Sequence, residues 1–333
     1  MTKALDESDW NAMFDERTPT LERLRDEVEH ILTAMLLDIK VHDIRVRVKK
    51  KKSFLEKIER KKYSAPFEQM TDLVGARVVC SFLNDIGKVE SAIGQEFAVV
   101  EKDNKLDESR PETFGYQSVH FLCKFKDGYS GPRYEGLHDL VFEIQLRTIL
   151  QDAWAVVEHT LAYKGRTSTP PDLRRDFSAL AGLLHVADKT FQQIQDRGEI
   201  LEGEANRDVR ELISETADGG LPAKVELDID RNTLRALLQE KFPDRTDSSP
   251  RIYASLAEEM AGDGVIGISQ LQEIIDEYID RVIEDEKRFP PKDMTTREHT
   301  RYGRVGIVRR IMRERNPDYK MLPMPRPNRK QPG

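Results

Sequence analysis

The sequence predicts an α+β protein followed by a mostly helical C-terminal unit. Between residues 14 and 204, short segments of alternating apolar and polar residues are separated by segments with apolar residues three or four positions apart. The first pattern is typical of strands with one buried face, and the second of amphipathic helices. Beyond residue 222 the helical pattern dominates. The length of 333 residues accommodates one large domain or two ordinary ones.

Composition narrows the class of protein. Hydrophobic residues make up 38% of the chain and charged residues 34%, which predicts a globular protein with a polar surface. No window holds the roughly 18 apolar residues of a membrane span, and the N-terminus has no signal-peptide pattern, so we expect a cytoplasmic protein. Cys80 and Cys123 stand alone in alternating apolar runs, which indicates buried free thiols. The net charge of −7 argues against a general polyanion binder, so any nucleotide site must come from a local cluster.

The N-terminal part predicts a helix followed by a strongly basic segment. Residues 14–41 predict an amphipathic helix that begins near Thr18, with Pro19 in its first turn. Residues 45–62 contain ten Lys or Arg among 18 residues, starting as an alternating strand and continuing as a helix capped by Ser53. A solvated charge run is one interpretation of this segment. No other basic run of the chain matches it, which favours a phosphate grip for a polyphosphate or RNA.

The segment at residues 72–82 predicts a buried strand with three unusual members. Asp72 stands at its start and Arg77 interrupts its apolar pattern, and neither is expected of a purely structural strand. Gly75 indicates a place where a backbone or a ligand comes close.

A helix over 84–95 and a strand over 97–100 are predicted next. The second half of residues 114–126 alternates as a further strand. At its entry, Tyr116 follows a glycine and is placed either to stack on a nucleotide base or to pack as a rim aromatic.

The segment at residues 139–164 predicts a strand that continues into a helix. Glu143, Gln145 and Arg147 alternate onto an open face, while Val141, Ile144 and Leu146 form the buried one. A carboxylate, an amide and a guanidinium on a rigid element suit phosphoryl transfer, although a solvated strand face is the interpretation that this stretch alone favours. Thr148 is expected to cap the helix. That helix is expected to turn Ile149, Ala153, Trp154, Val157 and Leu161 inward.

The rest of the chain predicts helices and two boundaries. A long helix over about 172–204 has one apolar face that includes Phe177, Leu180 and Phe191. The predicted organisation is a domain at 14–204, a linker at 205–222, a small helical unit at 223–320 and a disordered tail at 321–333. Within the small unit we expect a strand-like piece at 223–229 and helices near 231–241, 250–262, 268–287 and 296–315.

Four separate blocks resemble the synthetase domain of the RelA/SpoT family of alarmone synthetases. In order along the chain they are Arg47-x-Lys49-x-x-x-Ser53-x-x-x-Lys57, Asp72-Leu-Val-Gly-Ala-Arg77, Gly115-Tyr-Gln-Ser-Val-His120 and Glu143-Ile-Gln-Leu-Arg-Thr148. The resemblance covers roughly residues 15–200 and is closest to the free-standing small synthetases. Residues 205–333 are a C-terminal extension with no resemblance that we identify.

The resemblance implies a fold and a reaction. The fold is a mixed sheet flanked by helices, similar to nucleotidyltransferases. The reaction is transfer of the β,γ-pyrophosphate of ATP to the 3′-hydroxyl of GDP or GTP. Asp72 and Glu143 would hold Mg²⁺, and Glu143 would also take the proton from the attacking hydroxyl. Two carboxylates suit this chemistry because a metal offsets phosphate charge and a base activates a weak alcohol nucleophile.

The resemblance also implies nucleotide contacts. Arg47, Lys49, Ser53 and Lys57 match positions that grip the ATP phosphates, and Arg77 matches one whose guanidinium stacks on adenine. The acceptor side is implied to contain Tyr116 stacked on guanine, His120 near the transferred phosphates, and Gln145, Arg147 and Lys164.

Two departures leave the acceptor open. Where relatives often have Lys-Pro-Asn before the Gly-Tyr pair, this chain has Arg110-Pro-Glu-Thr-Phe114, and Asp152 stands where relatives commonly have His. The alternatives are pyrophosphate transfer to the 3′ end of tRNA or to adenosine nucleotides, and a catalytically inactive nucleotide- or RNA-binding regulatory module. The presence of both Asp72 and Glu143 argues against the inactive module. The C-terminal unit is predicted to cover the synthetase domain, to form a homo-oligomer or to bind a regulator, and the sequence does not separate these roles.

Overall fold

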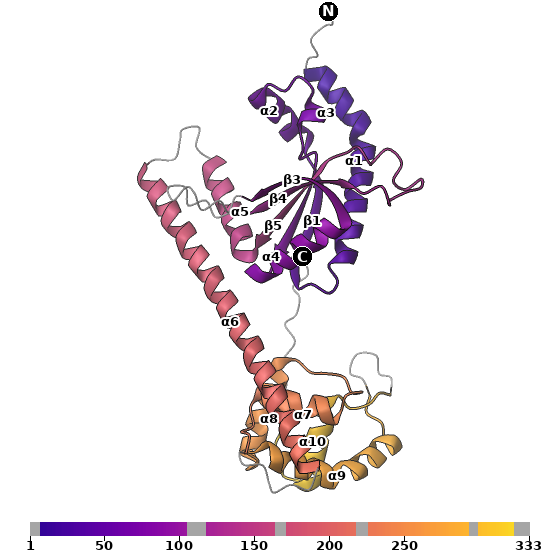
Figure 1. Cartoon of the computed structure of the whole chain (residues 1–333), viewed down its shortest axis with the longest axis vertical. Coiled ribbons are helices and arrows are strands. Elements are labelled where there is room, and N and C mark those ends of the chain that lie inside the picture. Colours follow the sequence, from indigo (N-terminus) through magenta and orange to yellow (C-terminus); the bar gives the residue numbers. More distant parts are fainter. Residues whose placement is uncertain (1–6, 105–117, 164–170, 218–225, 293–298, 323–333) are drawn as a thin grey trace, which may run out of the picture. The chain divides into compact units, whose positions relative to one another are not determined.

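The computed structural model divides into two compact units, Met1–Ile194 and Gln195–Gly333 (Figure 1). It describes residues 7–104, 118–163, 171–217, 226–292 and 299–322. Each unit has a hydrophobic core of its own.

The first unit is built on a five-stranded mixed sheet, as predicted. Its strands are β1 (Val41–Val48), β2 (Val74–Cys80), β3 (Phe97–Asn104), β4 (Val119–Phe125) and β5 (Phe142–Thr148). They lie in the order β1-β2-β5-β4-β3. β2 and β5 pair in parallel, whereas β1 with β2, β5 with β4 and β4 with β3 are antiparallel.

One face of this sheet is buried and the other is largely open. Helices α1 (Glu7–Met35) and α4 (Leu83–Glu96) pack on the buried face. Along β4 and β5 every second residue is buried, which is the period expected of a strand with one covered face. The buried residues of β5 are Phe142, Ile144, Leu146 and Thr148, so the prediction that placed Val141 on the buried face is wrong. Val141 precedes the strand and is out of step with its period of two.

The N-terminal helix and α2 (Lys51–Lys61) begin earlier than predicted. Pro19 lies inside α1 although it provides no N–H for the helix. The turns before it are held by burial, since Phe14 is 4% exposed and its ring centroid lies 4.9 Å from that of Phe54 in α2. The N-cap of α2 is Lys50, so Ser53 lies inside the helix and does not cap it.

Thr148 does cap α5 (Ile149–Tyr163), as predicted. Its hydroxyl accepts from the N–H of Gln151, and its own N–H donates to the Gln151 side chain. Trp154 is buried, whereas Ile149 and Val157 are exposed, so the predicted inward face is only partly correct. Ala153 is also exposed, and the side chain of Leu161 lies outside the described residues.

Helix α6 (Pro171–Ala217) is longer than predicted, and residues 205–217 are helical instead of forming a linker. Val209 and Leu212 explain the extension because both are buried in the core of the second unit. The predicted apolar face of the first half is largely exposed, at Leu180 and Phe191 among others.

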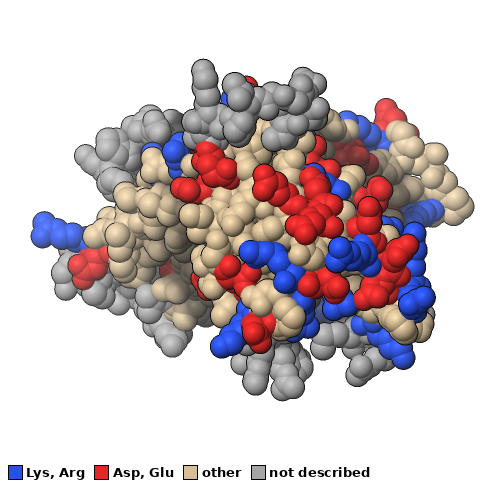
Figure 2. All heavy atoms as spheres, turned by 90° about the horizontal axis from the view of Figure 1, so that it is seen from below, with Lys and Arg blue, Asp and Glu red and all other residues tan. Residues whose placement is uncertain are grey.

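The second unit is helical. It contains α7 (Arg231–Lys241), α8 (Pro250–Gly262), α9 (Ile268–Arg288) and α10 (Arg304–Arg315). The first three match the predicted ranges within a residue, whereas α10 begins eight residues later than expected. In the described part of 223–229, the predicted strand is a single bridge from Asp228 to Gly267. The face seen in Figure 2 carries acidic and basic side chains next to one another, around an uncharged central area.

Two expectations from composition concern the cysteines and membranes. Cys80 and Cys123 are free and buried, and burial raises the pKa of each thiol to about 12. Among the described residues, no helix is long and apolar enough to cross a bilayer. The predicted disordered tail lies, from residue 323 onward, outside the described residues.

The short helix α3 (Pro66–Gln69) completes the first unit and leads into the segment that carries Asp72.

Candidate active site

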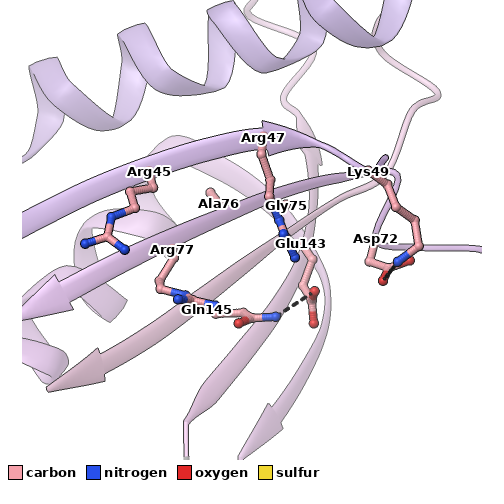
Figure 3. A pocket seen from close by; sticks show the side chains of 9 residues that line it. All are labelled: Arg45, Arg47, Lys49, Asp72, Gly75, Ala76, Arg77, Glu143 and Gln145. Atoms are coloured by element: carbon pink, nitrogen blue, oxygen red, sulfur yellow. Dashed lines mark hydrogen bonds and ion pairs between the residues drawn. The ribbon is translucent and has the colours of Figure 1, made fainter. Parts of the chain in front are cut away.

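The open face of the sheet carries two rows of polar side chains. Arg47 of β1 is the register partner of Gly75 on β2, which in turn is the partner of Glu143 on β5. Two residues further along, Arg45, Arg77 and Gln145 form the next row. Because side chains alternate between faces, both rows lie on the same side of the sheet. Figure 3 shows these side chains around one cavity, together with Lys49 and Asp72 at one end.

Gly75 leaves the floor of this cavity open. A Cβ built at this position has no atom within 4 Å. The residues on either side of it in the row, Arg47 and Glu143, therefore line a hollow of about 230 Å³. The lining contains four cationic side chains and two carboxylates, so the cavity favours an anionic ligand.

Asp72 is held by two lysines. Lys49 Nζ donates to its Oδ2 at 2.7 Å, and Lys57 Nζ donates to its Oδ1 at 3.0 Å. Burial alone raises the pKa of this carboxyl, but the two hydrogen bonds and their charges outweigh burial and the net pKa is lowered. Asp72 is therefore ionised at neutral pH. Its side chain remains 26% exposed, so it is open to a ligand.

Glu143 is oriented by neighbours on two strands. His120 Nδ1 on β4 lies 2.6 Å from its Oε1, and Gln145 Nε2 donates to its Oε2 at 3.0 Å. Burial raises its pKa, while the hydrogen bonds from His120 and Gln145 lower it, and the net pKa is lowered. On the far side of the imidazole, Ser118 Oγ lies 2.6 Å from His120 Nε2. Both ring nitrogens are thus engaged, which fixes the imidazole in place.

A third cluster joins β2, β5 and the first turn of α5. Arg77 Nη1 lies 2.9 Å from Asp152 Oδ1, and Arg147 Nη1 lies 3.6 Å from the same oxygen. Arg147 Nη2 also donates to Gln145 Oε1 at 3.1 Å. Gln145 therefore turns its amide nitrogen toward Glu143. Polar contacts thus run continuously from Asp152 of α5 through Arg147 and Gln145 to the Glu143 carboxylate.

A second, more basic cavity adjoins the first along α2. Its volume is about 440 Å³, and it shares Arg47 and Lys49 with the cavity described above. Its other lining residues, Lys50, Ser53, Glu56, Lys57 and Arg60, come from the N-cap and body of α2. Five cations against one carboxylate make it suited to phosphate oxygens.

Comparison with known proteins assigns this part of the chain. Residues 46–168 match the model of the family described as the region found in RelA / SpoT proteins. This segment is a RelA/SpoT domain. It contains every residue that lines the two cavities except Arg45. It also contains all five strands except residues 41–45 of β1.

Two GTP pyrophosphokinases of Bacillus subtilis (strain 168) are similar to the chain. YjbM is 27% identical over 209 residues, which are 60% of this chain and 94% of that protein. YwaC is 28% identical over 155 residues, which are 45% of this chain and 71% of that protein. Among solved structures, small alarmone synthetase 1 from Bacillus subtilis is 27% identical, with 59% of this chain and 100% of that chain covered and a TM-score of 0.47. The same synthetase bound to its product pppGpp is 25% identical, with 58% and 99% covered and a TM-score of 0.46.

The RelA/SpoT domain brings most of the sequence-predicted site residues together. Arg47, Lys49, Asp72, Arg77, Glu143 and Gln145 line the first cavity, and Ser53 and Lys57 line the second. His120 and Arg147 line neither cavity and instead hold Glu143 and Gln145 through hydrogen bonds. Tyr116 and Lys164 lie outside the described residues.

Three residues of this region were not singled out as site residues from the sequence. Arg45 lines the first cavity, and its position two residues before Arg47 on a predicted strand was the available signal. Ser118 lies two residues before His120, so the same alternation was its available signal, whereas Asp152 reaches Arg77 only through a tertiary contact. No periodic pattern along the chain indicates the contact of Asp152 with Arg77.

The domain's two carboxylates suit a hard divalent cation. Asp72 and Glu143 line one cavity, both have lowered pKa values, and carboxylate oxygens are the ligands that Mg²⁺ prefers. Within the described ranges, no group of three or more His, Cys, Asp or Glu side chains is placed to hold a metal ion by itself. A cation held by two carboxylates takes its remaining ligands from water and phosphate, which is the usual arrangement for Mg²⁺ at nucleotide sites.

Proposed function

We propose that the RelA/SpoT domain transfers the β,γ-pyrophosphate of ATP to the 3′-hydroxyl of GDP or GTP, making (p)ppGpp. The observation that carries this proposal is the convergence of Asp72 and Glu143 with a row of cations in one cavity. The match to the RelA/SpoT family model and the similarity to two GTP pyrophosphokinases support the same reaction.

The donor nucleotide fits the two connected cavities. The second cavity, with Lys57 and Arg60 on one helix, offers the ATP phosphates several cations within a short span. Arg47 and Lys49 belong to both cavities and are placed at their junction. The base then lies toward Arg77, whose planar and weakly hydrated guanidinium is suited to stacking on adenine.

Glu143 is the group we assign as general base. Its lowered pKa keeps the carboxylate ionised at neutral pH, so it is ready to accept the proton of the attacking hydroxyl. His120 and Gln145 each hold one carboxylate oxygen, which fixes its direction without occupying every lone pair. Proton removal and nucleophile alignment then depend on one oriented side chain.

Mg²⁺ is the cofactor we assign to Asp72 and Glu143. When bound, it supplies charge neutralisation for the transferred phosphoryl oxygens. Lys49 and Lys57 neutralise Asp72 in this structure. Both also line the phosphate cavity, so they are placed to exchange the carboxylate for phosphate oxygens when the donor binds.

GDP or GTP is the acceptor that we propose first. Tyr116 and Lys164 are assigned to it from the family resemblance alone. A tRNA acceptor is the second candidate, because the exposed side chains of Lys52, Lys61 and Lys62 extend the basic surface beyond the donor cavity. The compartment we propose is the cytoplasm, which supplies ATP and guanosine nucleotides and keeps thiols such as Cys80 and Cys123 reduced.

The experiment that tests the proposal offers a panel of acceptors. Purified protein, ATP labelled at the γ-phosphate and Mg²⁺ are incubated separately with GDP, GTP, AMP, unlabelled ATP and deacylated tRNA. Label in a guanosine nucleotide supports the proposed acceptor. If label appears only in tRNA or in an adenosine nucleotide, the assignment of the catalytic carboxylates stands and the assigned acceptor changes. No transfer to any acceptor contradicts an enzymatic role and supports a binding module.

A further inference from the structure

We propose that Asp152 is a positioning residue that holds Arg77 at the wall of the donor cavity so that its guanidinium receives the nucleotide base. The inference rests on the proposed function, since it assigns Arg77 to the base of ATP. It adds a residue that lines neither of the two cavities.

The geometry places one carboxylate between two guanidinium groups. Oδ1 of Asp152 lies 2.9 Å from Arg77 Nη1 and 3.6 Å from Arg147 Nη1. The side chains of Asp152 and Arg147 are each only 13% exposed, whereas that of Arg77 is 28% exposed and lines the cavity. Figure 3 shows Arg77 reaching along the cavity wall beside Gln145, its register partner on β5. Asp152 therefore contacts Arg77 from outside the cavity, and the part of the Arg77 guanidinium that lines the cavity stays open to a ligand.

The charges explain why a carboxylate is required at this point. Burial and the nearby charge of Arg77 both lower the pKa of Arg147, so the two cations are close enough to repel each other. A partly buried cation without a counter-charge is strongly unfavourable. Without Asp152, we expect Arg77 to swing away from Arg147 toward solvent, and the base would lose its stacking surface.

The contact is electrostatic and not strongly directional. Asp152 Oδ1 is buried and makes no hydrogen bond of good geometry, although Arg77 lies within ion-pair distance. The guanidinium plane of Arg77 is consequently attracted to Asp152 but not locked in one orientation. This leaves the plane free to align with a base, which a bidentate carboxylate pair would prevent.

Asp152 is itself fixed by the start of α5. It lies in the first turn of this helix, where the helix dipole favours a negative charge. The turn is anchored by the Thr148–Gln151 cap, and the Thr148 hydroxyl donates to buried Asp188 of α6 at 2.6 Å. The carboxylate thus sits on a rigid support, as a positioning group must.

The test compares two ligands that differ in having a base. Binding of ATP and of inorganic tripolyphosphate, each with Mg²⁺ and no acceptor, is measured by calorimetry for the wild type, Asp152→Asn and Asp152→Glu. We expect Asp152→Asn to weaken ATP binding about tenfold, the size of an ordinary polar contact, and to leave tripolyphosphate binding unchanged. Asp152→Glu should recover part of the loss. Asp127→Asn, which removes a charge from an exposed turn after β4 and away from the Arg77–Asp152–Arg147 cluster, is the matched control.

A double-mutant cycle identifies the partner. If Asp152 acts through Arg77, Arg77→Ala weakens ATP binding and adding Asp152→Asn weakens it no further. Additive losses, or an equal loss for ATP and tripolyphosphate, would overturn the positioning role.

The outcome is separable from that of the proposed reaction. A wild-type protein that shows this binding pattern but transfers no pyrophosphate would contradict the reaction and retain the role of Asp152. A protein that transfers pyrophosphate but shows an equal loss for both ligands in Asp152→Asn would retain the reaction and contradict the role.

Discussion

The two units of this protein use the same ionic groups in opposite ways. In the second unit, Glu259 accepts hydrogen bonds from Nη2 and Nε of Arg309, at 2.6 and 2.9 Å. The side chain of Glu259 is fully buried. Tyr319 and the backbone of Leu322 donate to the same carboxylate. Burial raises the pKa of Tyr319 well above its ordinary range, so it remains a donor at neutral pH.

In the first unit, the carboxylates are less completely satisfied. Asp72 accepts one lysine on each oxygen and stays partly exposed in a cavity. Asp152 Oδ1 and Arg147 Nε are buried without a hydrogen bond. Saturated pairing indicates a structural role, whereas incomplete pairing beside a cavity indicates a site prepared for a ligand. The distinction is in the number and geometry of contacts, not in residue type.

The largest expected effect tests the structural side of this comparison. Glu259→Ala leaves Arg309 buried without its partner, and we expect the second unit to lose about 3–5 kcal/mol of unfolding free energy. Trp10 and Trp154 both lie in the first unit, so tryptophan fluorescence reports on that unit while circular dichroism reports on both.

During urea unfolding, the dichroism transition of Glu259→Ala should therefore shift to lower urea while the fluorescence transition changes little. A shift of both transitions by the same amount would show that the two units unfold together, and no shift would show that Glu259 is not structural.

The next effect tests the ligand side. Asp72→Asn should lower the rate of pyrophosphate transfer by roughly two orders of magnitude, or about 3 kcal/mol, because it removes a carboxylate from the proposed cation site. Its unfolding midpoint should fall only slightly, since the residue is partly exposed and the amide oxygen of Asn still accepts a hydrogen bond from a lysine. Asp127→Asn, in an exposed turn after β4, is the control for both measurements. Normal activity in Asp72→Asn would show that Asp72 is not part of the active site.

Gly75→Ala should produce a smaller, selective effect. A Cβ at this position meets no protein atom within 4 Å, so the variant should fold normally. Its methyl group occupies the floor between Arg47 and Glu143, and we expect the KM for ATP to rise several-fold, up to about 1 kcal/mol in binding.

Gly94→Ala in α4 is the matched control for this variant, because its Cβ also enters open space, far from the cavity lining. It should raise stability by up to about 1 kcal/mol and leave the KM unchanged. An equal KM for ATP in the two variants would mean that ATP does not contact the floor of the cavity.

The smallest effect concerns acid pH. The pKa values of Asp72 and Glu143 are held below the ordinary carboxyl range by their cationic and hydrogen-bonding partners, against the effect of burial. Their contribution to stability is therefore present above the unfolded value of about 4 and is lost as the pH falls through the lower folded values. Activity should show no acid limb from these groups above about pH 5. A profile of kcat/KM with an acid limb near pH 6 that disappears in Glu143→Asp would contradict this assignment.

The strands and the open face could be predicted because they depend on local alternation. Period two along β5 places Glu143, Gln145 and Arg147 on one side, and the structure confirms this. The basic segment likewise forms β1 and α2 and lines the second cavity. The roles of Tyr116 and Lys164 stay predictions from the family resemblance.

The failures share a physical cause, which is burial set by distant residues. Pro19 is predicted in the first turn of its helix, but α1 begins at Glu7 because packing of Phe14 on Phe54 outweighs the hydrogen bond missing at the proline. Residues 205–217 have the polar composition of a linker, yet Val209 is buried in the second core. The pairing of Arg77 with Asp152 spans 75 positions, a separation at which no sequence period operates.

The measurement that tests the central claim most directly is pyrophosphate transfer by the wild type and by Glu143→Gln. ATP labelled at the β-phosphate and ATP labelled at the γ-phosphate are each supplied with GDP and Mg²⁺ in single-turnover reactions. We predict that both labels enter the guanosine product, and that Glu143→Gln, folded and still able to bind ATP, slows the transfer at least about a hundredfold. Transfer of the γ-label alone, or an unchanged rate in Glu143→Gln, would contradict the account.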